Sequence, residues 1–175
     1  MGVFIKAVKP LDLLIETEKN NINFERLNNA EETTGNDTII VFSLDFSPLE
    51  HLTKFKYGLY VEGEHGENDC SMAYSTYNAF RASICKMVTN EEYNDYCRKI
   101  MMNEIDSSEP FVEFFWFADN EGCFDYAVAE KLYKDFEKYY NTASEMLDSH
   151  FFNYYKSYMA VLKDCIELKG VVEYR

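Results

Sequence analysis

Two long amphipathic segments follow one another near the C-terminal end of the chain, and they restrict the fold more than any other feature. In the second segment, apolar residues recur at steps of three and four, which places them on one face of a helix over residues 149–168. These residues are Phe152, Tyr155, Met159, Leu162 and Ile166. Gly170 follows where a left-handed cap commonly ends a helix.

The first of these segments predicts a helix that Asp125 caps and that continues to about residue 147. Val128, Leu132, Phe136 and Tyr139 fall on one face of it. Two consecutive helices with buried faces pack against each other and against a shared core. We therefore expect the last two helices to form an antiparallel pair.

Strands are predicted where β-branched and aromatic residues gather, at residues 2–8, 38–44 and 56–62. The apolar run 111–117 predicts a central strand, because both of its faces are apolar. Residues 171–174 predict a strand that closes a sheet edge, and residues 119–122 predict a turn.

Polar segments separate these strands. Residues 17–37 and 63–69 predict surface loops, the first preceded by a short helix around residues 11–17. Two further helices are expected in the middle of the chain. Residues 75–88 place Tyr77, Phe80 and Ile84 on one face, with Ser75 or Thr76 as the cap, and residues 89–92 have the spacing of a capping box that opens a helix to about residue 102.

These elements predict an α+β fold. We expect a small mixed or antiparallel sheet packed against three to four helices, the last two of them an antiparallel pair, in one domain over residues 1–175. With 47% hydrophobic residues, the chain of 175 residues has enough apolar material for one core, and splitting it would leave two marginal ones.

The cellular compartment is predicted from the absence of membrane, secretion and disulfide signals in the sequence. No run approaches the roughly 18 consecutive apolar residues of a membrane helix. Lys6 and Lys9 interrupt the apolar N-terminal segment before a signal-peptide core can form. The five cysteines are odd in number and widely scattered, which favours reduced thiols over a disulfide framework. We expect a soluble, cytoplasmic protein.

The charge balance restricts the partners. Seventeen basic residues against 31 acidic ones give a formal charge of −14. Such a surface disfavours direct contact with nucleic acid or an anionic membrane, because both carry negative charge. It suits a basic protein or a nucleoprotein partner. Plain solubility is the alternative interpretation.

Two acidic runs are candidates for an interaction surface that mimics a phosphate backbone. Their members are Glu62, Glu64, Glu67 and Asp69 in the first run and Glu104, Asp106 and Glu109 in the second. Mimicry requires these carboxylates to lie along one face. The alternative is that they are solvated loop residues, the ordinary role of charge runs.

Metal and catalytic signatures are weak. His65 lies among acidic residues, but no Cys-x-x-Cys or His-x-x-x-His spacing accompanies it. The segment from Asp119 to Asp125 resembles a calcium loop, yet its glycine is fourth rather than sixth. No serine-hydrolase elbow or phosphate-binding glycine loop is present, and a pair formed by Cys70 and His65 is the kind that scattered residues offer by chance. We therefore predict no metal, no cofactor and no catalytic residues.

Arg81 is the basis of a second hypothesis. It lies on the helix that carries Tyr77, next to core positions, in a chain with few arginines. Ser75, Tyr77, Arg81, Asp119 and Glu121 would line a pocket for a small polar ligand if they met in space. The alternative is that Arg81 pairs internally with Asp119 or Glu121.

Several short motifs resemble a loose group of small bacterial and phage proteins. They are the Met-Gly start, residues 74–81, the Asp-Asn-Glu-Gly turn at 119–122 and the Gly-Val-Val of residues 170–172. The likeness covers roughly residues 70–175, with Thr76 where the group has glycine. It implies the order of the elements and a prokaryotic or phage setting, and it favours Ser75, Tyr77, Arg81, Asp119 and Glu121 meeting at one place. It implies no activity.

The leading hypothesis is thus a non-enzymatic intracellular interaction protein, encoded by a phage or mobile element, whose acidic surface binds and blocks a basic, nucleic-acid-binding partner. The pocket around Arg81 and Asp119, as a ligand site or minor enzyme, is the alternative. A homodimer that pairs through the apolar stripe of the last helix is a third possibility.

Overall fold

One antiparallel sheet and a layer of helices make up the protein. The computed structural model describes residues 2–18, 21–35, 37–41, 47–116 and 122–174. Five strands lie in the order β2-β3-β1-β5-β4, and all four neighbouring pairs are antiparallel. The strands are β1 (Gly2–Glu16), β2 (Thr38–Val41), β3 (Gly58–Ala73), β4 (Gly122–Asp125) and β5 (Val171–Tyr174). The predicted α+β class is confirmed.

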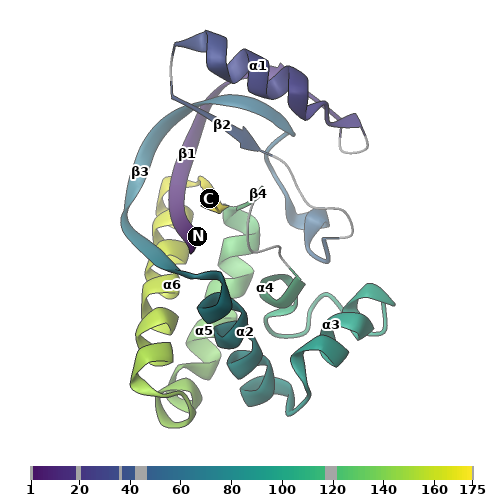
Figure 1. Cartoon of the computed structure of the whole chain (residues 1–175), viewed down its shortest axis with the longest axis vertical. Coiled ribbons are helices and arrows are strands. Elements are labelled where there is room, and N and C mark those ends of the chain that lie inside the picture. The colour runs from purple at the N-terminus through teal and green to yellow at the C-terminus, as the bar shows by residue number, and fades with distance from the viewer. Residues whose placement is uncertain (1, 19–20, 36, 42–46, 117–121, 175) are drawn as a thin grey trace.

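Six α-helices are present in the described part of the chain, more than the three to four expected. They are α1 (Phe24–Thr34), α2 (Tyr74–Thr89), α3 (Tyr93–Met101), α4 (Val112–Trp116), α5 (Tyr126–Met146) and α6 (Ser149–Leu168), and a 3-10 turn spans Glu50–Leu52. Figure 1 shows α5 and α6 side by side beneath the sheet, α2 in front of them, and α1 above the far end of β1 and β3. The antiparallel pairing of the last two helices is confirmed. None of the described helices is long and apolar enough to cross a membrane.

The two long strands β1 and β3 pair along almost their whole lengths, from Gly2 opposite Ala73 to Glu16 opposite Gly58. The predicted helix at residues 11–17 is therefore wrong, because residues 11–16 continue β1. The predicted loop at residues 63–69 is wrong as well, because it lies within β3. Register shifts along the pair absorb the irregular polar segment, so its backbone still bonds to β1.

The sheet curls until its two outer strands meet. The thiol of Cys123 on β4 donates to the carbonyl of Ile40 on β2, with Sγ and O 3.7 Å apart. A small apolar cluster lies on one face of the sheet and includes residues of both outer strands. Its members are Val8, Ile39, Val41, Tyr60, Cys123 and Val171. β5 lies between β1 and β4, so the expectation that residues 171–174 close a sheet edge is wrong.

The other face of the sheet and the helices enclose the main core. On α6 the fully buried residues are Tyr155, Tyr158, Val161, Leu162 and Cys165. The outer members of the predicted stripe, Phe152, Met159 and Ile166, are only partly buried. The buried face is turned slightly from the predicted one because α6 packs on β1, β3 and α5 together.

The aromatic run at residues 111–117 forms α4 over Val112–Trp116, so the predicted central strand is wrong. Phe111 has a positive φ of 60°, and its amide donates to the carboxylate of Asp135 on α5 at 2.8 Å. Its carbonyl then accepts the amide of Phe115 at 2.9 Å and closes a helical turn. A short run that is apolar on every side fits a buried helix as well as a buried strand, so periodicity does not separate the two.

Within the polar segment at residues 17–37, predicted as a loop, the structure has α1. Asn23 caps it by accepting the amide of Arg26 at 2.9 Å, and Gly35 ends it with φ 66°. Leu27 is its one buried residue in the part of the chain that is described. With so little apolar periodicity, the helix depends on its caps and its contacts with the sheet.

Two predicted N-caps and one predicted C-cap are wrong. Ala73 precedes α2 and Glu92 precedes α3, and neither side chain makes a capping hydrogen bond. Lys169, with φ 49°, ends α6 in the left-handed conformation. Gly170 instead allows close approach of two strands, because a Cβ there would lie 2.2 Å from the carbonyl oxygen of Val8. Asp125 caps α5 as predicted.

A buried carboxyl on α4 ties this helix to the segment before the 3-10 turn. Glu113 is 1% exposed and accepts the hydroxyl of Ser47 at 2.6 Å and the amide of Leu49 at 3.0 Å. Burial raises the pKa of Glu113, although the bonds from Ser47 and Leu49 oppose the shift. The folded protein therefore favours the neutral acid more than the unfolded chain does.

We expect the stability of the protein relative to Glu113→Gln to fall as the pH rises. With a folded pKa above the ordinary 4.5, Glu113 contributes its stability fully below pH 4.5 and loses it as the pH rises through the folded pKa. The loss is at most about 1.4 kcal/mol per pH unit. Urea unfolding of both proteins across this range measures it, and a difference that does not change with pH contradicts the expectation.

Candidate functional site

Arg81, predicted as a ligand-binding residue, lies on α2 and is held between two tyrosine rings. The residue is 6% exposed, with Cζ 4.6 Å from the ring centre of Tyr77 and 5.4 Å from that of Tyr93 on α3. Nη2 donates to Oδ1 of Asn78, one turn earlier, at 2.6 Å. The ring contacts and this bond fix the direction of the guanidinium group.

The predicted ligand-binding set comes together only in part. Tyr77 and Arg81 are in contact, whereas Ser75 is exposed at the start of α2, two residues before Tyr77 and so on another side of the helix. Asp119 and Glu121 lie outside the described residues. The predicted pairing of Arg81 with either of them therefore stays a prediction.

Tyr77 belongs to a buried group of tyrosines. The hydroxyls of Tyr158 and Tyr174 share a hydrogen bond, and the ring centres of Tyr77 and Tyr174 are 6.2 Å apart. Burial raises the pKa of Tyr158 and of Tyr174. Tyr77 itself is fully buried, so it supports Arg81 from inside the core.

A groove of about 370 Å³ opens beside Arg81, between α2, α3 and α4. Besides Arg81, it is lined by Tyr93, Asn94, Cys97, Arg98, Met101, Phe115 and Trp116. The sequence predicted a pocket at Arg81 but none of these other residues. The sequence contains only a weak indication of these lining residues. Tyr93, Cys97 and Met101 recur at four-residue steps, which places them on one face of α3.

The floor of this groove is anchored by one carbonyl. The hydroxyl of Tyr93 and the thiol of Cys97 both donate to the carbonyl of Phe115, at 2.9 and 3.6 Å. Burial raises the pKa of Tyr93 and of Cys97, and in Cys97 it outweighs the opposing effects of Tyr93 and Arg81. Cys97 is thus a neutral thiol rather than an activated nucleophile.

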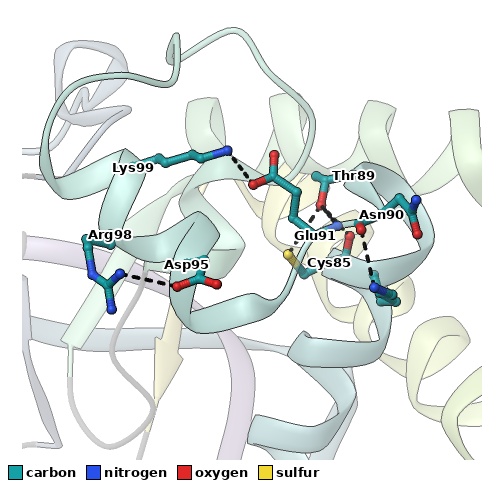
Figure 2. A network of polar contacts seen from close by, with 8 residues as sticks. Cys85, Thr89, Asn90, Glu91, Asp95, Arg98 and Lys99 are labelled. Carbon is teal, nitrogen blue, oxygen red and sulfur yellow. Dashed lines mark hydrogen bonds and ion pairs between the residues drawn. The ribbon is translucent and has the colours of Figure 1, made fainter.

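The junction of α2 and α3 positions the outer wall of the groove. In Figure 2, Lys99 contacts Glu91, and Nη1 of Arg98 lies 3.2 Å from Oδ1 of Asp95. Thr89 donates to the carbonyl of Cys85 at 2.8 Å and accepts the amide of Glu91 at 3.1 Å. Arg98 keeps 63% of its side chain exposed and lies at the rim.

The first predicted acidic run lies on β3 and divides into paired and unpaired carboxylates. Glu62 is enclosed, with Oε1 2.9 Å from Nζ of Lys6 and 2.9 Å from Nε2 of His65. Glu64, Glu67 and Asp69 are exposed. In the described part of the chain, no ion pair involves these three.

The second acidic run lies in the connection between α3 and α4. Glu104, Asp106 and Glu109 are exposed there. Hydrogen bonds from the hydroxyl and the amide of Ser108 lower the pKa of Asp106. Figure 1 places this connection at the lower right and β3 along the left side. The two runs therefore lie in two separate segments of the fold, and the arrangement of all seven carboxylates along one face stays a prediction.

Other chemistry at the predicted positions has little support. Within the described ranges, no group of three or more His, Cys, Asp or Glu side chains is arranged to hold a metal ion. Cys70 is buried while His65 is exposed, and burial raises the pKa of Cys70 to about 12, so the two do not form a reactive pair. All five cysteines are free thiols.

Comparison with known proteins found no match to this chain among protein-family models, curated proteins or solved structures.

Proposed function

We propose that this protein is a non-enzymatic binding protein that uses carboxylates on β3 to bind and block a basic, nucleic-acid-binding partner. The observation that carries the proposal is the exposure of Glu64, Glu67 and Asp69 on one strand, with no ion pair to any described residue. Their charge is available to a partner, whereas that of Glu62 is used within the sheet.

The position of these carboxylates suits contact with another molecule. β2 pairs with β3 only from Gly58 to Val61, so the acidic part of β3 extends past β2. Acidic side chains on such a strand also discourage association of sheets edge to edge. A test of the proposal must therefore separate partner binding from this protective role.

Net charge adds a long-range attraction to the local contacts. At −14 the chain attracts a basic partner from a distance and speeds encounter. A partner surface that normally holds nucleic acid presents the complementary lysines and arginines. A small acidic inhibitor of this kind fits the prokaryotic or phage setting that the sequence resemblance implies.

We expect a triple variant, Glu64→Gln, Glu67→Gln and Asp69→Asn, to bind basic partners about tenfold more weakly, because each exposed ion pair contributes roughly 0.2–1 kcal/mol. The probe is a fluorescent peptide of lysine and arginine, titrated at low and high salt. Binding of the unaltered chain should weaken as salt rises.

A second triple variant provides the matched control. Glu104→Gln, Asp106→Asn and Glu109→Gln change the net charge by the same amount at the other acidic group. If both triple variants lose affinity equally, net charge alone attracts the peptide and β3 is not the binding site. The blocking role needs a separate test. A bacterial protein that the unaltered chain binds at low salt is loaded with its nucleic acid, and the unaltered chain is added. A partner that keeps its nucleic acid contradicts the blocking role.

A further inference from the structure

A histidine lies among the exposed carboxylates of β3. His65 follows Glu64 directly and precedes Glu67 and Asp69 on the same strand. Its side chain is 48% exposed, so both solvent and a bound partner have access to the ring. Histidine is the side chain that ordinarily changes charge between pH 5 and 8. The strand that presents the proposed binding carboxylates therefore also carries a group whose charge can oppose theirs.

The side chain of His65 faces away from the helices, on the same side of the sheet as that of Asp69. A Cβ at Gly66 would lie 2.6 Å from a carboxylate oxygen of Asp164 on α6, so position 66 faces α6. Successive residues of a strand alternate between its two faces, which directs His65 to the other face. Asp69 is opposite Lys6 in the register of β3 and β1, and residues paired in this way share a face. Because Lys6 contacts His65, the histidine and Asp69 lie on one side of the sheet.

The contacts of the ring assign its neutral form and the position of its proton. Nδ1 of His65 lies 3.2 Å from Nζ of Lys6, and an ammonium group only donates, so Nδ1 accepts and carries no proton. The proton of the neutral ring is then on Nε2, which lies 2.9 Å from Oε1 of Glu62. Nζ of Lys6 also lies 2.9 Å from that oxygen and 3.7 Å from Oε2 of Glu173 on β5. In the described part of the chain, the charged groups at the ring or at its ammonium partner are thus Lys6 on β1, Glu62 on β3 and Glu173 on β5.

Protonation of His65 changes this arrangement. The second proton goes to Nδ1, the atom that accepts from Lys6, so attraction between the two side chains is replaced by repulsion between two cations. The new positive charge lies on the strand that presents Glu64, Glu67 and Asp69. There it offsets part of their negative charge and repels the lysines and arginines of a basic partner.

We propose that His65 is a pH switch for the binding site on β3. The neutral ring leaves the carboxylates free to attract a basic partner, and the protonated ring weakens the attraction. This inference rests on the proposed function, because it concerns the same carboxylates. It adds a condition to that function, since the partner is held at neutral pH and released more readily in acid.

The affinity of the unaltered chain for the peptide of lysine and arginine, labelled with a pH-insensitive dye, tests the inference. It is measured between pH 7.5 and 5.5 at constant low salt. We expect it to fall by about two- to fivefold, the size of the effect of one exposed charge pair. The peptide keeps its charge over this range and carboxyl groups ordinarily titrate at lower pH, so histidine is the side chain that changes charge.

Two substitutions fix the charge at position 65. His65→Gln is uncharged throughout and should bind the peptide equally well at both pH values. His65→Lys is always positive and should bind at both pH values about as weakly as the unaltered chain does at pH 5.5. His150→Gln, at an exposed position on α6, is the matched control and should keep the full pH dependence. Circular dichroism at both pH values checks that the variants fold.

The nitrogen-15 signals of the His65 ring give a readout that needs no partner. At pH 8 they should show a proton on Nε2 and none on Nδ1. A ring with its proton on Nδ1 would contradict the contact with Lys6 and with it the switch.

The binding results separate a failure of the switch from a failure of the proposed function. Absence of binding by the unaltered chain at pH 7.5 contradicts the proposed function, and the switch with it. Binding that is equally strong at both pH values overturns the switch alone. The same conclusion follows if His65→Gln keeps the full pH dependence, or if His150→Gln loses as much of it as His65→Gln does.

Discussion

Replacement of Phe114 by alanine should lower the free energy of unfolding by about 3–5 kcal/mol, the usual cost of removing a fully buried aromatic ring. Phe114 is 0% exposed. Its ring centre lies 5.1 Å from that of Tyr158, 5.6 Å from Phe136 and 5.8 Å from Phe80. The cavity left by alanine would open between α2, α4, α5 and α6, where no single neighbour can fill it.

Chemical denaturation by urea, followed by far-ultraviolet circular dichroism, measures this loss. Phe24→Ala is the matched control, because the same ring is removed from a position on α1 that is 44% exposed. We expect the control to cost much less than Phe114→Ala. Equal costs at the two positions would show that Phe114 is not at the centre of the core.

Asp125→Ala should destabilise the protein by about 2–4 kcal/mol, because one carboxylate serves two separate segments. Oδ1 accepts the amides of Ala127 and Val128 at the start of α5, at 3.0 and 3.5 Å. Oδ2 accepts the amides of Lys54 and Phe55, before β3. Loss of a cap costs roughly 1–2 kcal/mol, and the two part-buried amides left without this acceptor add about 1–2 kcal/mol.

Asp148→Ala separates the two contributions. Asp148 caps α6 in the same way, accepting the amides of His150 and Phe151 at 2.9 Å each. It is exposed, however, and among the described residues it bonds to no second segment. Its loss should cost only about 1 kcal/mol. Hydrogen exchange should show faster exchange at Lys54 and Phe55 in Asp125→Ala but not in Asp148→Ala. Unchanged exchange in both variants would mean that Asp125 does not hold this segment.

The helices that the sequence predicted well are those whose own residues carry the signal. The segment at 149–168 forms α6 within those bounds, and Asp125 begins α5 as expected. Both have many turns of apolar periodicity, so errors at single positions matter little. The α+β class followed from combining them with β-rich runs at both ends of the chain.

Helical periodicity predicted only part of the groove beside Arg81. Tyr77 and Arg81 are neighbours on one helix, and helical spacing alone brings them together. The partners of Arg81 at the groove come from α3 and α4, because helix packing, rather than sequence distance, brings Tyr93 and Phe115 there. The two acidic runs are similar in sequence, and only the fold places them apart.

Local chemistry by itself determined the long helices, the cap at Asp125, the reduced cysteines and the negative charge, because each depends on residues near in sequence or on simple totals. Tertiary structure decided whether an apolar run became α4 or a strand, and whether polar residues 63–69 became a loop or part of β3. The physical reason is that a short segment satisfies its backbone hydrogen bonds in either form. The choice then depends on distant partners, Asp135 for the start of α4 and β1 for β3.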